Sequence, residues 1–375
     1  MYHTLSQYWN KIQGSLFPEL EEELGPLTEK QMQLISILEM VRIEQFLTSS
    51  FGCVGRPPKN RPALARAFVA KSVYNMATTT ALVDRLKSDL SLCQICGWEQ
   101  RGQVPDESIF CRVFAEFSAS ELPKRVHNAL IKKVYENRII GDLSRDSTSI
   151  NARERPAPKK KKSKKAKKRG RPKKGEEAPK ELKRLDRQLK MTQQERLNDL
   201  PKNCDVGAKA NSKGNREYWI GYKCHIDTAN GDIPISCLVT SASLHDSQAA
   251  IPLAEETASK VTSLYDLMDS AYDCPQIIEH SKSLEHTPII DVNPRRDALA
   301  KAEFKAEAKA QKTVNWKPPE KIRYNQRSSA ERVNSRLKDD FGGRMIRVRG
   351  NVKVACHLMF GILALTADAL LNLVR

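Results

Sequence analysis

The chain has 375 residues, with 63 lysines and arginines against 45 aspartates and glutamates, which gives a formal net charge of +18. This charge favours a polyanionic partner, either nucleic acid or an anionic membrane surface. The length predicts two or three domains at about 150 residues each. The nine cysteines are odd in number and scattered, which excludes a fully paired disulfide framework and predicts reduced thiols in the cytosol. Cys93 and Cys96 are a lone CxxC pair, so we expect them to pack in a core rather than bind zinc.

The chain up to about residue 135 has the periodicity of several short helices joined by polar turns. Thr28 and Gln31 are spaced as a capping box before an apolar stripe. Further helix starts are predicted at Pro105-Asp106 and at Leu122-Pro123. Such a set of helices suits DNA binding, with or without a helix-turn-helix, and equally suits a structural bundle.

From Arg138 onward the pattern predicts strands as well as helices. We expect strands at 139–146, 217–227, 232–240, 264–269 and 288–292, and helices at 247–260, from Pro275 and at 327–340. Asn230-Gly231 is a hairpin signal between the second and third strands. The order of these elements is that of a ribonuclease H-like fold, an α/β fold in which a mixed sheet is flanked by helices.

Two aspartates are predicted to meet at one edge of this sheet. Asp146 ends the first strand and Asp269 ends the fourth, and open α/β sheets place their sites at the carboxyl ends of strands. Strand parity does not separate these two from their acidic neighbours, for which we expect capping, turn or surface roles: Asp142, Asp266 and Asp273. For Asp246, which follows His245, we expect a helix-cap role, with a place near the same edge as the alternative.

The helix expected at 327–340 has a distinctive polar face. Tyr324, Arg327, Glu331 and Lys338 fall within roughly 60° of one another at helical spacing. A carboxylate between two cations suits a site where a divalent metal meets phosphate oxygens, and a phenol there hydrogen-bonds or stacks. The alternative is a solvated face that carries an ordinary i,i+4 pair between Arg327 and Glu331.

The series Tyr324-x-x-Arg327-x-x-x-Glu331-x-x-x-x-x-x-Lys338 resembles the Tyr-Arg-Glu-Lys signature of bacterial insertion-sequence transposases with an Asp-Asp-Glu active site. Other segments resemble the same family and its N-terminal helical domain: 55–58, 96–98, 145–148, 211–223, 244–247 and 266–273. The resemblance implies that Asp146, Asp269 and Glu331 are catalytic and hold two Mg²⁺ ions, for which Mn²⁺ substitutes, about 4 Å apart. It also implies DNA contacts by the remaining residues of the signature.

The resemblance implies a cytoplasmic, nucleoid-associated bacterial enzyme. Such an enzyme binds terminal inverted repeats in double-stranded DNA, cleaves at the element ends and joins the 3′-hydroxyl to target DNA. In the implied roles, Arg327 and Lys338 hold DNA phosphate and Tyr324 positions the flanking strand, in a homodimer or larger synaptic complex. Two alternatives stay open: a metal-dependent nuclease of the same fold without strand transfer, and a non-catalytic DNA-binding protein.

Residues 153–202 interrupt the pattern after the first strand, and their Lys-rich composition predicts a largely disordered insert. Lys159 to Lys174 contain twelve lysines and arginines and no acid. Within them Arg169 and Arg171 flank a glycine, as in an AT-hook that enters the minor groove; the alternative is a non-specific basic arm. We therefore divide the chain into a helical N-terminal domain (1–135), a catalytic domain (136–152 and 203–375) and this insert.

Two features argue against a membrane or secreted protein. The sequence after Met1 has no basic stretch followed by an apolar one, so we expect no secretory signal. The apolar residues 354–374 are interrupted by His357, Asp368 and Asn372, so no stretch reaches the ~18 apolar residues of a membrane span. We expect a buried core helix there.

Overall fold

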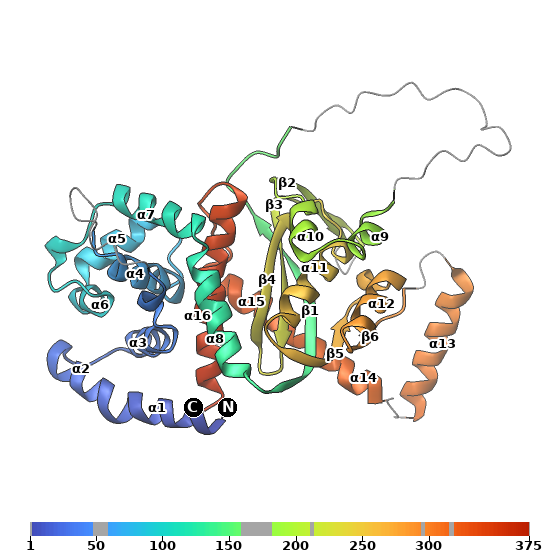
Figure 1. Ribbon diagram of the computed structural model, residues 1–375, viewed down its shortest axis with the longest axis horizontal. Helices are drawn as coiled ribbons and strands as arrows, with labels where there is room; N and C mark the ends of the chain where they lie inside the picture. The colour runs from blue at the N-terminus through green and yellow to red at the C-terminus, as the bar shows by residue number, and fades with distance from the viewer. Residues whose placement is uncertain are drawn as a thin grey trace.

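The computed structural model describes residues 2–47, 59–158, 182–210, 214–293, 297–314 and 319–374. A group of helices lies on one side of the molecule and a sheet with its own helices on the other, with α8 and α16 between them (Figure 1). The segment 55–58 and the two arginines of the AT-hook prediction, Arg169 and Arg171, lie outside the described residues.

The N-terminal part is helical, as predicted. Its α-helices are α1 (Tyr2–Lys11), α2 (Phe17–Leu24), α3 (Glu29–Val41), α4 (Arg61–Val73), α5 (Thr79–Ser88), α6 (Leu90–Cys96), α7 (Glu107–Ala119) and α8 (Leu122–Tyr135). The capping box before α3 is confirmed, because Thr28 and Gln31 each accept a hydrogen bond from the other's backbone N–H. Cys93 and Cys96 are both fully buried, in keeping with packing.

The helix α16 (Asn351–Asn372) is the central element of the molecule. It packs on α3, α4, α7 and α8 and also on strand β4, and the ring of its Phe360 lies 5.7 Å from that of Phe68 in α4. Gly361 is required for close approach, since a Cβ there would lie 2.6 Å from the carbonyl oxygen of Phe341. By length and composition α16 is the one described helix apolar enough to cross a membrane, but most of it is buried inside the molecule, which confirms the predicted core helix.

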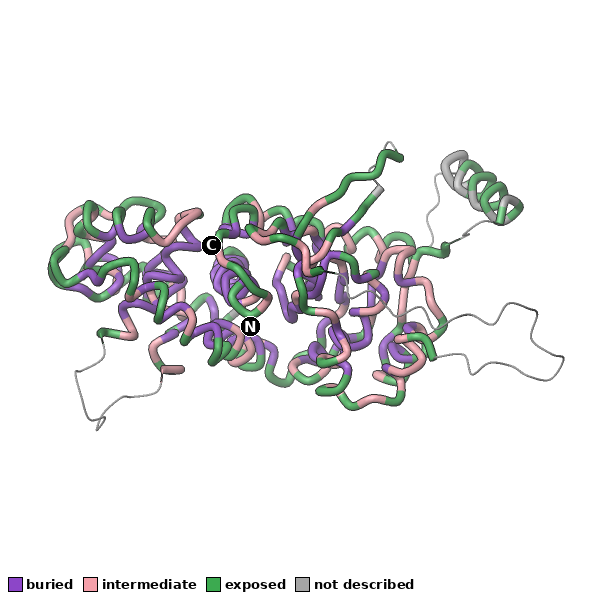
Figure 2. Tube along the Cα trace, turned by 90° about the horizontal axis from the view of Figure 1, so that it is seen from above, coloured by how far each residue is buried: buried purple, intermediate pink, exposed green. Residues whose placement is uncertain are grey.

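One hydrophobic core extends from the N-terminal helices through α16 into the sheet. Buried residues accordingly run through both parts of the molecule rather than forming two separate centres (Figure 2). The chain changes from helices to strands near residue 135, but the hydrophobic core continues across this boundary. The proposed domain limits stay a prediction.

The sheet is mixed and has six strands in the order β2-β3-β1-β5-β6, with β4 paired to β3. The strands are β1 (Ile139–Asn151), β2 (Asp205–Ala210), β3 (Arg216–Ala229), β4 (Ile233–Ser241), β5 (Thr262–Met268) and β6 (Thr287–Ile290). The first strand is antiparallel to β3 and parallel to β5. Helix α11 (Ser247–Ala258) packs on β3 and β4, while α15 (Ser328–Asp339) packs on β1 and β3.

Helices therefore cover both faces of the sheet. Thr257 of α11 bonds to Asp227, which pairs with Arg145, whereas Asn334 of α15 bonds to Asp146. Since consecutive residues of a strand point to opposite faces, α11 and α15 lie on opposite sides of β1. The predicted ribonuclease H-like α/β fold is confirmed.

Some elements were not predicted. The strand β2 and the helices α13 (Ala298–Val314) and α14 (Pro319–Tyr324) are additions to the expected order, whereas the helix expected from Pro275 is present as α12 (Pro275–Ser283). The prediction of disorder is wrong for residues 182–202, which contain α9 (Arg184–Gln188) and α10 (Gln193–Asp199). These two helices pack on α11 because Leu197 and Leu200 join its apolar cluster and Arg196 pairs with Glu255 at 2.6 Å.

Candidate active site

The two predicted aspartates stand side by side at the end of the parallel pair β1 and β5. Arg145 is paired with Met268 in the register of these strands, so Asp146 and Asp269 are the next residue of each. Burial, together with the charge of Asp269, raises the pKa of Asp146 to about 6. Burial also raises the pKa of Asp269. Two buried carboxylates that lie side by side repel each other and are poorly solvated, so a cation bound between them would stabilise their charged forms.

The neighbouring acids are engaged elsewhere. Arg323 donates to Asp142 at 2.6 Å and its guanidinium lies 3.9 Å from the ring centre of Tyr265. Asp266 is 1% exposed and accepts a hydrogen bond of 2.8 Å from Ser281. The expected surface, turn or cap roles are therefore wrong for Asp142 and Asp266, because both are buried with specific partners. Asp273 does accept the backbone N–H of a nearby loop residue at 2.8 Å.

Asp246 does not have the cap role that we expected. It stands at the N-cap position of α11, yet its side chain accepts no bond from that helix. Lys223 instead donates to it at 2.9 Å. Burial opposes ionisation of Asp246, but His225 and Lys223 outweigh it and hold the pKa of this carboxyl below its ordinary value. Its negative charge contributes to the raised pKa of Asp269, so it belongs to the surroundings of the site.

Glu331 is close to the site but is not joined to the aspartates. Its carboxylate accepts a hydrogen bond of 2.7 Å from Arg327 and is 56% exposed. The positive charge of Arg327 opposes the rise in pKa of both Asp146 and Asp269, so its guanidinium lies near enough to influence both aspartates while it is bonded to Glu331. Across the ranges that the structure describes, no three acidic, histidine or cysteine side chains are arranged to hold a metal ion.

The four residues of the polar helix face do not share one helix. Tyr324 ends α14 (Pro319–Tyr324), and a 3₁₀ turn ending at Arg327 separates it from α15. The expected helix at 327–340 is otherwise close to the observed α15. Burial and a hydrogen bond to Asp291 raise the pKa of Tyr324, and its ring lies 5.7 Å from the guanidinium of Arg327. Burial lowers the pKa of Lys338, which lies near the end of α15.

Two residues near the aspartates were not found from the sequence. Asn334 donates its side-chain N–H to Asp146 at 3.0 Å. Its spacing of three residues from Glu331 is the signal that would have identified it, since i and i+3 share a helix face. Lys209 of β2 contributes positive charge that opposes the rise in pKa of Asp146 and Asp269. It was missed because β2 itself was not predicted.

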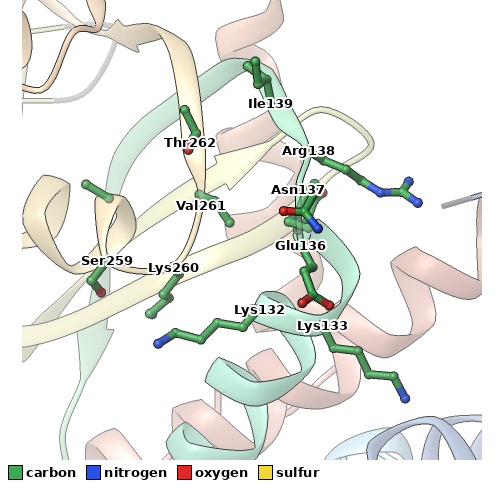
Figure 3. Close-up of a pocket in the computed structure, with 12 residues that line it drawn as sticks. Lys132, Lys133, Glu136, Asn137, Arg138, Ile139, Ser259, Lys260, Val261 and Thr262 are labelled. Atoms are coloured by element: carbon green, nitrogen blue, oxygen red, sulfur yellow. The ribbon is translucent and has the colours of Figure 1, made fainter.

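Several surface grooves lie away from the aspartates. One of about 680 Å³ is lined by the ends of α8 and α11 and by the first residues of β1 and β5. Lys132, Lys133 and Arg138 stand around it (Figure 3). Asp146 and Asp269 lie toward the opposite ends of the same two strands. The candidate site is therefore identified by the chemistry and the position of Asp146 and Asp269 rather than by a groove.

The donor set suits a divalent cation. Asp146 and Asp269 offer hard oxygen ligands, which Mg²⁺ and Mn²⁺ prefer. A mixed sheet of this order with paired aspartates at the end of adjacent parallel strands defines a ribonuclease H-like protein.

Comparison with protein families agrees with this class. Residues 186–367 match the model of the transposase DDE domain, and residues 21–116 match that of a transposase domain (DUF772). The chain belongs to the insertion-sequence DDE transposases with an N-terminal helical region. Asp269 and Glu331 lie inside the first match, whereas Asp146 precedes it. No curated protein and no solved structure matches the chain. Family membership implies a DNA substrate and an enzyme of the nuclease and transposase kind, of a family that generally uses divalent metal.

Proposed function

We propose that this protein binds terminal inverted repeats, cleaves double-stranded DNA at the ends of its element and joins the freed 3′-hydroxyl to target DNA. The observation that carries the proposal is the position of Asp146 and Asp269 on neighbouring parallel strands. Both reactions are in-line displacements at phosphorus, and acidic side chains that gather divalent cations are the usual protein contribution to them. Family membership supports the same activity.

Asp146 and Asp269 would hold the cations, with Glu331 as the third carboxylate. When bound, two Mg²⁺ ions would polarise the scissile phosphodiester and promote ionisation of the attacking water or 3′-hydroxyl. Mn²⁺ has the same preference for oxygen ligands and would substitute. The raised pKa of both aspartates is in keeping with this role, because burial disfavours their charged forms and a bound cation would favour them.

Arg327 offers a route by which Glu331 joins the aspartates. Its guanidinium donates a hydrogen bond of 2.7 Å to Glu331. A DNA phosphate presents the same paired oxygen geometry to a guanidinium. Transfer of Arg327 from Glu331 to a phosphate would therefore release the carboxylate at the moment when DNA arrives.

Other cations near the site would bind the strands. Lys338 would hold phosphate along α15, and Lys209 would do so from β2, while Tyr324 would position the flanking strand by stacking or hydrogen bonding. Arg169 and Arg171 would add contacts from the basic segment, either in the minor groove or as a non-specific arm.

The reaction requires two DNA ends in one complex, which supports a homodimer or larger synaptic assembly. With DNA as substrate, the protein would act in the bacterial cytoplasm at the nucleoid. Neither statement depends on the details of the site.

A single experiment separates the proposal from its two rivals. The purified protein is incubated with labelled terminal-repeat DNA, Mg²⁺ and a target plasmid. Products joined to the plasmid support transposition, and products that are only cut support a nuclease. DNA that is bound but unaltered, in Mg²⁺ and in Mn²⁺, would contradict catalysis. Asp269→Asn is the control, because any product that it still forms does not come from this site.

A further inference from the structure

The buried amide of Asn334 connects helix α15 to the strand that carries Asp146. Its Nδ2 donates to Asp146 Oδ2 at 3.0 Å, and the residue is 6% exposed. Helix α15 packs directly on β1, and both elements lie in the middle of the catalytic half of the molecule (Figure 1). This contact therefore joins the two segments that provide Asp146 and Glu331.

The position of Asn334 on α15 is at the boundary of the buried face. Ala330, Val333 and Leu337 of the same helix are almost fully buried, while Glu331 is 56% exposed. Three residues along a helix correspond to a rotation of about 60° from Glu331. Asn334 is thus placed to contact the sheet while Glu331 stays at the surface beside it.

The side-chain amide of Asn334 is not the residue that stability alone would favour at this position. Its Oδ1 is buried and has no hydrogen-bond partner among the residues that the structure describes. A buried acceptor without a partner lowers the free energy of unfolding, and a leucine of similar volume would not have this defect. A residue that retains such a group while donating to an acidic ligand has a function in the site.

We propose that Asn334 is a positioning residue for the metal site. It fixes the orientation of the Asp146 carboxylate and holds α15 against β1. Glu331, which is about one helical turn before Asn334, is thereby kept near the aspartates. The inference rests on the proposed function, since it assigns Asn334 to the same site. Partners that orient a metal ligand typically contribute 10- to 100-fold in metal affinity or activity.

The test compares two substitutions of Asn334 with a matched control. Asn334→Leu removes the donor but keeps the volume, and Asn334→Ala removes both. Ser329→Ala is the control, because Ser329 is a buried polar residue of the same helix whose hydroxyl donates to the backbone oxygen of Ala229 at 3.3 Å. Binding of Mn²⁺ to each full-length protein without DNA is measured by calorimetry, together with the thermal unfolding midpoint.

We expect both Asn334 variants to bind Mn²⁺ at least about tenfold more weakly than the wild type, and Ser329→Ala to bind it normally. Asn334→Leu removes a buried amide oxygen without a partner but also removes the donor to Asp146, so its unfolding midpoint should stay close to the wild-type value. Weaker Mn²⁺ binding at a nearly unchanged midpoint will therefore not come from instability. Normal Mn²⁺ binding by Asn334→Leu would overturn the inference, as would equal loss in the Ser329 variant. If the wild type binds no Mn²⁺ at all, the metal-dependent function itself fails, which is a different result.

Discussion

Two consecutive residues of β1 face opposite sides of the sheet and have opposite electrostatic surroundings. Arg145, on the side of α11, is 2% exposed and donates two hydrogen bonds of 2.8 Å to Asp227. Thr257 donates a further bond of 2.7 Å to the same carboxylate. Asp146, on the side of α15, has another aspartate as its neighbour and a pKa that burial and this neighbour raise to about 6.

Within the single strand β1, Arg145 therefore has a structural role, whereas the surroundings of Asp146 suit a functional one. On the α11 side each buried charge has a partner of opposite sign, so the ion pair holds β1, β3 and α11 together. On the α15 side the charges are left incompletely balanced, and a protein tolerates this at sites that receive an external cation. Four predictions test this comparison, and they are given in order of decreasing effect.

The largest effect is expected for the unbalanced side. Asp146→Asn and Asp269→Asn should each lower the DNA cleavage rate by about a thousandfold or more, since residues of one catalytic unit are not replaceable singly. Repeat binding, which comes from phosphate contacts elsewhere, should persist. Cleavage and filter binding measured on the same preparations check this, and cleavage near the wild-type rate would remove the aspartate concerned from the site.

The balanced side should respond in stability. Arg145→Ala leaves Asp227 buried without its cation and should lower the free energy of unfolding by about 3–5 kcal/mol. The double variant Arg145→Met with Asp227→Leu replaces both charges and should lose much less. Urea unfolding measures both proteins. If Arg145→Ala is as stable as the wild type, the ion pair between Arg145 and Asp227 does not stabilise the sheet.

The raised pKa of Asp146 predicts a pH dependence with a definite sign. Its pKa of about 6 in the folded state lies above the ordinary value of 3.8, so the folded protein binds the proton more tightly than the unfolded chain. Its contribution to stability is present below pH 3.8 and is lost as pH rises through 6. Asp146→Asn should therefore stabilise the protein by about 1–3 kcal/mol at pH 7.5 and by little at pH 4.

The measurement is the difference in unfolding free energy between Asp146→Asn and the wild type at several pH values. A constant difference would contradict the assigned pKa. Buried histidines act in the opposite direction in both proteins, since burial lowers the pKa of His127 and of His357 to about 3. Both proteins should accordingly lose stability as pH falls below about 6.5, and this loss cancels in the comparison.

The smallest effect is expected for the cation of the Arg327–Glu331 pair, in which the Arg327 side chain is 22% exposed and that of Glu331 56% exposed. Arg327 bonds to the exposed Glu331, and exposed pairs contribute about 0–1 kcal/mol. Arg327→Ala should therefore change the free energy of unfolding by less than about 1 kcal/mol while it slows cleavage. A loss of stability as large as that of Arg145→Ala would mean that Arg327 has a structural role like that of Arg145.

The order of the strands and helices was predictable because its signals are local. Asn230-Gly231 marks a hairpin and Pro275 begins a helix, and both elements are present. Strand β2 was missed because Val206 is the only β-branched residue in its sequence, Asp205 to Ala210, which is otherwise glycine, alanine and charged residues. Helices α9 and α10 were missed because the adjoining lysine-rich composition masks their few leucines.

The site was predictable in part. Asp142 and Asp146 share the same strand parity, so the sequence pattern alone does not choose between them. Arg323, from a segment far along the chain, bonds to Asp142; this contact favours Asp146 for the site, and no sequence pattern reveals it. Asn334 looks like an ordinary polar residue of an amphipathic helix, because its partner on β1 is 188 positions away.

The place of α16 has a consequence for synthesis of the protein on the ribosome. This helix occupies residues 351–372 and supports α3, α4, α7 and α8, which were translated long before it. The hydrophobic core of the N-terminal helices is therefore completed only after α16 has been synthesised. We expect chains that stop before Asn351 to remain open to proteases, which limited proteolysis of such a truncated chain would show.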